Sequence, residues 1–318
     1  MVSLLQILKE AIDSPKAIVL AGGAGSGKSY ITKNILGDLK DGKFKPKGSS
    51  QEFLYLNPDD IVEKKGVSLG AAMGEFNQIF QDTTEKNQNL IWDTTGANIK
   101  NTLGKLQDYN KFMVMVYTHP IVSILQNKKR DRRLPIEAVL KTWDSVYGNI
   151  PEYKKILGDN FNLLQNNIPG YEKDIKEFNQ AVQGGKESLK KYLSDLVGQD
   201  PEGFKSSFSK PFEFETKEIE TSFEETLPQT SYSDKDEDIL KQIQREYEKE
   251  YKKKGEDPGK DILEKKIKSA RNTKARNEKN YNENIEGIVS KLSSPEFKQL
   301  TEPNTPEQVQ QKLKAFAS

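Results

Sequence analysis

Four glycines, a lysine and a serine stand close together between residues 22 and 29, directly after the apolar run AIVLA at 17–21. Glycine loses more backbone freedom on folding than any other residue, so a cluster of glycines needs a local reason. Backbone N–H groups without flanking side chains can surround an oxyanion, and the start of a following helix adds a favourable dipole. The cluster therefore predicts a site for a phosphate group.

The residues Gly22, Gly27, Lys28 and Ser29 match the G-x-x-x-x-G-K-[ST] pattern of the P-loop in full, between a strand-like run and a helix-like run. Lys28 is expected to neutralise the β- and γ-phosphates of ATP, and the Ser29 hydroxyl to bind Mg²⁺. The alternative is a glycine-rich turn without a ligand. The expected nucleotide-binding residues are Gly22, Gly23, Ala24, Gly25, Ser26, Gly27, Lys28, Ser29 and Tyr30.

Two carboxylates follow the second apolar run, FLYLN at 53–57. Ligands of open α/β sheets gather at the carboxyl ends of the strands, where a carboxylate can accept the proton of an attacking hydroxyl. We predict Asp59 as this base and Asp60 as a substrate-binding residue. An aspartate at a helix start also caps the helix, so one of the two can serve each purpose.

The third run, NLIWD at 89–93, ends in Asp93. An apolar strand with a terminal carboxylate is typical of a magnesium site in nucleotide-binding proteins, and Asp93 is the predicted ligand. The alternative is a carboxylate that only caps the end of the strand. Further along, five cations occupy six positions at 128–133. They could close over the phosphates and stabilise charge in the transition state, or form a solvated helix face.

The order of these motifs resembles the small P-loop kinases of the zeta-toxin and polynucleotide-kinase group, over residues 15–168. The stretch LNPDD resembles the family's segment around the general base, with Asp59 at the matching position. The family usually has Arg or Lys three residues later, where this chain has Val62, with Lys64 and Lys65 nearby.

Two further segments carry the resemblance. WDTTGAN at 92–98 resembles the segment that helps to hold the phosphate acceptor, which implies that role for Thr94 and Thr95. RDRR resembles the lid that supplies arginines to the donor phosphates, which implies that role for Arg130, Arg132 and Arg133.

Five apolar runs must position these residues, at 17–21, 53–57, 89–93, 112–117 and 161–165. They are continuous rather than alternating, as expected for strands buried on both faces of a parallel sheet, and helix-like segments separate them. The pattern predicts an α/β protein with a three-layer P-loop NTPase fold and a mainly parallel five-stranded sheet over residues 1–168. The helix after the first strand is expected over 29–39.

The second half is different. We predict a helical extension at 169–198, a disordered linker at 199–238 and a charged helical tail at 239–318. The tail has sparse apolar anchors, which favours a solvated helix. A partner-binding or nucleic-acid-binding arm is the alternative.

Composition excludes several classes of protein. The chain has 318 residues, of which 31% are charged and 34% hydrophobic, enough for one good core. Its net charge of +1 argues against a chain that coats nucleic acid along its whole length. No cysteine is present, and a single histidine, His119, excludes histidine-based metal sites. No apolar run could cross a membrane and the start is not signal-like, so we expect a cytoplasmic protein.

Three side chains near the motifs are expected to be structural: His119 as a helix cap, and Trp143 and Tyr147 as core residues rather than a base-stacking platform. The predicted function is transfer of the γ-phosphate of ATP to a hydroxyl, with Mg²⁺ as cofactor. The acceptor stays open between a nucleic acid 5′ end, a nucleotide sugar and a small metabolite. The alternatives are an ATPase or GTPase, and a nucleotide-switched protein whose C-terminal helices bind a protein partner.

Overall fold

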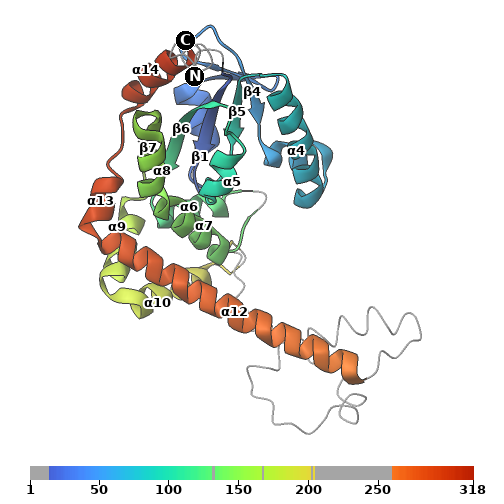
Figure 1. Cartoon of the computed structure of the whole chain (residues 1–318). Coiled ribbons are helices and arrows are strands. Elements are labelled where there is room, and N and C mark those ends of the chain that lie inside the picture. Colours follow the sequence, from blue (N-terminus) through green and yellow to red (C-terminus); the bar gives the residue numbers. More distant parts are fainter. Residues whose placement is uncertain (1–13, 131–132, 167, 202, 205–259) are drawn as a thin grey trace, which may run out of the picture.

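A computed structural model describes residues 14–130, 133–166, 168–201, 203–204 and 260–318 (Figure 1). Residues 1–13 lie outside the described part. So do residues 205–238 of the predicted linker and residues 239–259 of the predicted tail.

One sheet of seven strands, in the order β2-β3-β4-β5-β1-β6-β7, forms the centre of the molecule. Its parallel part contains β1 (Lys16–Ala21), β4 (Phe53–Leu56), β5 (Leu90–Asp93), β6 (Asn110–Tyr117) and β7 (Phe161–Gln165). These are the five predicted strands. The α/β class and the mainly parallel sheet are therefore confirmed.

The prediction of five strands is wrong, because a hairpin adds two at one edge. The helix after β1 comprises α2 (Lys28–Ile31) and a π-helical continuation η1 (Thr32–Leu36), and it ends before Gly37 rather than at Leu39. The antiparallel strands β2 (Gly37–Lys40) and β3 (Lys43–Pro46) follow. A side chain at Gly37 would overlap the Lys45 carbonyl, and Asp41 and Gly42 both have positive φ, as a tight hairpin turn requires.

Helices cover both faces of the sheet (Figure 1). Those before residue 205 are α3 (Pro58–Lys65), α4 (Leu69–Glu85), α5 (Ile99–Gly104), α6 (Pro120–Lys128), α7 (Ile136–Gly148), α8 (Ile150–Leu157), the short η2 (Gly158–Asn160), α9 (Glu172–Gln183) and α10 (Gly185–Gln199). The segment predicted as a helical extension thus contains α9 and α10, and it buries Phe178, Val182 and Leu189 in the main core. No described helix combines the length and the apolar character of a membrane span.

The C-terminal helices are α12 (Lys260–Ser293), α13 (Pro295–Leu300) and α14 (Pro306–Ala317). The expectation of a solvated tail is wrong for most of this region. Ile285, Ile288 and Phe297 are buried in the core on one face of the sheet. On the other face, Val309 and Leu313 of α14 are buried with Ile18, Leu20, Phe112 and Val114 of the strands.

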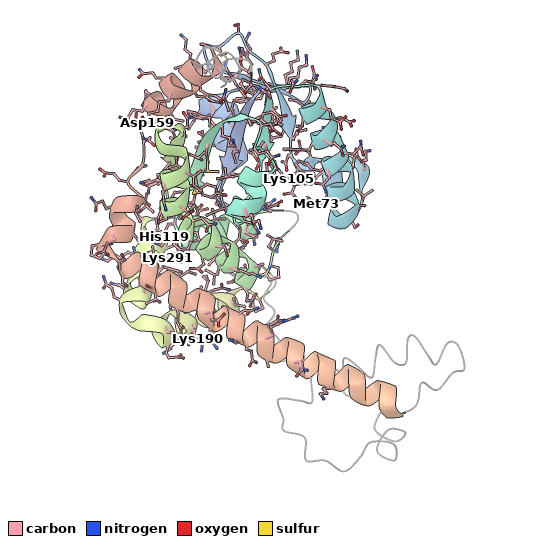
Figure 2. The ribbon with its side chains drawn as sticks, in the orientation of Figure 1. Met73, Lys105, His119, Asp159, Lys190 and Lys291 are labelled. Carbon is pink, nitrogen blue, oxygen red and sulfur yellow. The ribbon has the colours of Figure 1, made fainter. Side chains whose placement is uncertain are left out.

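Polar contacts fix the same helices. Lys291 Nζ (labelled in Figure 2) lies 2.6 Å from Asp144 Oδ1 of α7, and both side chains are largely shielded from solvent. Gln310 Nε2 donates to the Ile35 carbonyl at 2.6 Å, which joins α14 to the helical segment after β1. The apolar anchors are few but correctly spaced, because Val309, Leu313 and Ala317 repeat every four residues on one face.

Loss of the α14 anchor should destabilise the whole protein. Leu313→Ala should lower the free energy of unfolding by about 2–5 kcal/mol, because it opens a cavity between the helix and the sheet. Gln311→Ala, at an exposed position of the same helix, should change it by less than about 0.5 kcal/mol. Urea unfolding measures both. Equal midpoints for the two variants would show that α14 is not part of the cooperative fold.

Candidate functional site

The strands β1, β4, β5 and β6 are parallel, so their carboxyl ends lie side by side at the same end of the sheet. From β1 the chain runs to β2 at one edge of the sheet, and from β6 it runs to β7 at the other edge. Adjacent strands whose connections diverge create a crevice at which ligands bind in open α/β sheets. The glycine-rich loop at 22–27 lies directly at this point, between the end of β1 and the start of α2.

The loop requires glycine for two reasons. Gly25 and Gly27 have φ of 74° and 82°, in the left-handed region that other residues rarely adopt. A Cβ at Gly22 would lie 2.7 Å from Ser26 Oγ and 2.9 Å from the Val116 carbonyl, and a Cβ at Gly25 would overlap the Ser123 carbonyl. Gly23 is different, since its Cβ would meet only ordinary contacts at 3.8 Å.

Two side chains at the ends of other strands hold the loop through one backbone carbonyl group. The Ser26 carbonyl accepts hydrogen bonds from Thr118 Oγ1 at 2.8 Å and from Asn166 Nδ2 at 2.9 Å. The same Asn166 amide covers Gly27, where a Cβ would overlap it. Sequence reasoning missed both residues. Both could have been noticed, because each directly follows a predicted strand, but nothing in the sequence pairs them with Ser26, which lies 92 and 140 positions away.

Two side chains of helix α7 bond to the backbone at the end of β6, beside the loop. Trp143 Nε1 donates to the Thr118 carbonyl and Tyr147 Oη donates to the Val116 carbonyl, at 2.8 and 2.7 Å. Both side chains are buried, so the prediction that they are core residues is confirmed.

Lys28 and Asp93 lie together beside the loop. Lys28 Nζ donates to the Gly22 carbonyl at 2.9 Å and lies 3.7 Å from Asp93 Oδ1. Tyr55 Oη donates to Asp93 Oδ2 at 2.9 Å. Burial raises the pKa of Asp93, and both Lys28 and the Tyr55 hydroxyl oppose that rise. Asp93 therefore does more than cap the end of β5, because its two carboxylate oxygens contact Lys28 and Tyr55. Tyr55 was missed because it lies inside an apolar run.

The chain of hydrogen bonds continues to the carboxylates after β4. Asn57 Nδ2 donates to Asp60 Oδ1 at 3.0 Å and approaches Tyr55 Oη at 3.4 Å. Asn57 Oδ1 accepts from the Asp59 N–H, so Asn57 is the N-cap of α3 and neither aspartate is needed for capping. Asp60 is half-buried, whereas Asp59 is exposed. Burial raises the pKa of Asp60, and Lys64 and Lys33 lower it.

The other predicted residues at this end of the sheet lie around the loop. Ser29 and Tyr30 are exposed in the first turn of α2. The Thr94 N–H donates to the Leu20 carbonyl, and the Thr95 carbonyl accepts from the Gly22 N–H at 3.1 Å. The segment after β5 is thus bonded through its backbone to β1 and to the loop.

The predicted lid residues are only partly described, because Arg132 lies outside the described residues. Arg130 is exposed after the end of α6. Arg133 Nη1 donates to the Gly203 carbonyl at 3.3 Å, and Lys128 forms an ion pair with Asp200. The structure therefore places two cations of this cluster against the segment that follows α10.

His119 is at the N-cap position of α6, as expected, although its side chain makes no capping hydrogen bond. Its Nε2 lies 3.1 Å from Asn179 Oδ1, and its ring packs edge-on against Phe178. Burial lowers the pKa of His119 to about 4, so the ring is neutral at physiological pH. These contacts support a structural role.

The residues fit a Mg²⁺–polyphosphate ligand. Among the residues that the structure describes, no three His, Asp or Glu side chains cluster as a dedicated metal site. Magnesium in nucleotide sites takes most of its ligands from phosphate and water, and only one or two from protein. The exposed Ser29 hydroxyl and the Asp93 carboxylate match that requirement, and the loop backbone that a Cβ at Gly22, Gly25 or Gly27 would crowd matches a phosphate cradle.

No family model and no curated protein matches this chain. Among solved structures, it is similar to a crystal structure of the AvrRxo1-ORF1:AvrRxo1-ORF2 complex with sulphate ions, at a TM-score of 0.35 and 16% sequence identity. The match covers 50% of this chain and 59% of that chain. Similarity at this level carries no argument about function, so the site must be judged from its own geometry.

A matched pair of glycine variants tests the loop. Gly25→Ala should weaken ATP binding by about 100-fold or more, because it forces a positive φ and a clash with the Ser123 carbonyl. Gly23→Ala adds the same methyl group where only ordinary contacts exist, and it should weaken binding less than about fivefold. Calorimetric titration with Mg·ATP measures both. Equal losses would refute the loop geometry.

Proposed function

We propose that this protein is a kinase that transfers the γ-phosphoryl group of ATP to a hydroxyl, on a P-loop NTPase fold like that of the zeta-toxin and polynucleotide-kinase group. The observation that carries the proposal is the glycine loop at the point where the sheet connections diverge, with Lys28 beside the buried Asp93. A phosphate cradle, a cation and a metal-binding carboxylate then occupy one small region.

Each residue of the site has a proposed role. The loop N–H groups and Lys28 hold the β- and γ-phosphates. Ser29 and Asp93 would hold Mg²⁺, which would neutralise charge on the phosphate oxygens. Tyr55 fixes the orientation of Asp93 through its hydrogen bond at 2.9 Å. Asn166 and Thr118 keep the loop in the conformation that presents its N–H groups.

The carboxylates after β4 distinguish a kinase from a simple hydrolase. In the proposed step the acceptor oxygen forms a bond to the γ-phosphorus, the bond to the bridging oxygen breaks, and ADP leaves with that electron pair. The hydroxyl proton passes to Asp59, which is exposed at the start of α3. Asp60 is held by Asn57 and binds the acceptor. Arg130, Arg132 and Arg133 stabilise the transferred group when the lid closes.

The electrostatics near Asp60 suggest the kind of acceptor. The resembling family has a cation three residues after the base, and this chain has Val62 there. Lys64 and Lys33 partly offset the rise in the pKa of Asp60 that burial causes, whereas Glu63 and Asp59 add to it. Two lysines beside the acceptor position favour a substrate that carries its own anionic group, such as a nucleotide sugar or a nucleic acid 5′ end.

Two carboxylate variants test the assignment of roles. Asp59→Asn should lower the maximal rate of phosphoryl transfer by about 100-fold or more while leaving the KM for ATP nearly unchanged, because a base acts on the acceptor. Asp93→Asn should instead raise the Mg²⁺ concentration needed for half-maximal activity. Radiolabelled ATP, screened against each acceptor class, measures transfer directly.

Other results would give other conclusions. If both variants weaken Mg·ATP to the same extent, Asp59 is a metal ligand and not a base. If the wild-type protein releases phosphate to water at a rate that no acceptor changes, it is an ATPase. Tight nucleotide binding without turnover would indicate a switch.

A further inference from the structure

The N-terminal part of α12 extends away from the body of the protein, as Figure 1 shows. We call residues 260–279 of this helix the arm. The helix meets the body further along, where Ile285 and Ile288 are buried and Lys291 contacts Asp144. A cavity of about 170 Å³ lies between α7 and α12 where the arm meets the body. Its lining residues are Glu137, Ala138, Lys141, Asn277, Asn280, Tyr281 and Asn284.

The arm has a strong excess of positive charge. Residues 265–279 include seven lysines and arginines and one glutamate. They are Lys265, Lys266, Lys268, Arg271, Lys274, Arg276, Lys279 and Glu278. Lys268, Asn272, Arg276 and Lys279 are exposed, and their spacing of four, four and three positions puts them on one face of the helix. Lys279 forms a long, exposed ion pair with Glu283, at 3.8 Å.

Like charges stand at neighbouring positions of the helix surface in the arm, although Asp261–Lys265, Glu264–Lys268 and Lys274–Glu278 are opposite charges four positions apart. Lys265 and Lys268, then Lys268 and Arg271, and also Arg276 and Lys279, are like charges three positions apart. Like charges at this spacing repel and destabilise a helix. A polyanion that ran along the arm would remove the repulsion.

We propose that the arm binds the phosphate backbone of nucleic acid. Of the arm's other side chains, the apolar ones are Ile262, Leu263, Ile267, Ala270 and Ala275, so no large apolar residue follows Ile267, and the acidic ones are Asp261, Glu264 and Glu278. A protein interface is built around apolar or aromatic anchors, and a membrane-surface helix needs a continuous apolar face. Contacts to phosphate require only cations and hydrogen-bond donors such as Asn, Ser and Thr, which is what the arm offers.

The proposed binding does not depend on sequence. Cations distributed along a helix match the regular spacing of backbone phosphates, and such contacts carry no base information. The net charge of +1 for the whole chain is consistent with this, because the positive charge is local. The inference is independent of the proposed kinase activity.

The test uses the full-length protein and a fluorescent single-stranded oligonucleotide, followed by anisotropy at increasing NaCl. The affinity should fall with salt with a logarithmic slope of about −2 to −4, as release of counterions from several phosphates requires. The variant Lys268→Gln/Arg276→Gln/Lys279→Gln should bind about tenfold or more weakly at about 50 mM NaCl, with a slope flatter by about 2.

A control with the same change of charge is available on the body. Lys173→Gln/Lys176→Gln/Lys191→Gln changes three exposed lysines of α9 and α10, and it should alter the affinity by less than about twofold. Both variants should bind Mg·ATP like the wild type. Three results would overturn the proposal: no binding by the wild type at low salt, equal losses in the two variants, or displacement of the oligonucleotide by polyglutamate as effectively as by unlabelled DNA.

Discussion

The carboxylate of Asp93 is buried at the end of the sheet where the functional residues meet, and a buried charge needs compensation. Lys28 and the Tyr55 hydroxyl provide it. The need to compensate this charge holds Lys28 in place after the glycine loop. The contacts of Asp93 with Lys28 and Tyr55 also link the end of β1 to β5 and β4. Through Asn57 the same chain of polar contacts reaches Asp60. The glycine loop, the proposed metal ligand and the two carboxylates after β4 therefore depend on one connected arrangement.

The C-terminal helices stabilise this arrangement from a distance. Helix α14 covers the face of the sheet that the segment after β1 covers only in part, and Gln310 bonds to the Ile35 carbonyl of that segment. Helices α12 and α13 pack on the opposite face, close to α7, whose Trp143 and Tyr147 support the loop. The residues that form the site end by about 166, but the fold that positions them extends to residue 317.

Sequence alone predicted the parts of this structure that depend on local signals. Continuous apolar runs located all five parallel strands, and glycine spacing located the loop. The hairpin was missed because its strands have four residues each, GDLK and KFKP, and lack a continuous apolar run. The packing of α14 was missed because its three anchors come at the end of a long segment that is otherwise charged and polar, which looks like a solvated helix. Tyr55 was missed because it lies inside an apolar run, and Asn166 because nothing in the sequence pairs a residue at that strand end with Ser26, 140 positions away.

The central claim is that the loop after β1 binds the β- and γ-phosphates of a nucleotide and that Lys28 neutralises them. Thermal unfolding with ATP, ADP, AMP or adenosine, each with Mg²⁺, tests this most directly, because a ligand that binds only the folded state raises Tm with its affinity. The account predicts that ATP and ADP raise Tm while AMP and adenosine do not, and that Lys28→Met loses the shifts. Equal shifts for ATP and AMP, or full shifts in the Lys28 variant, would contradict it.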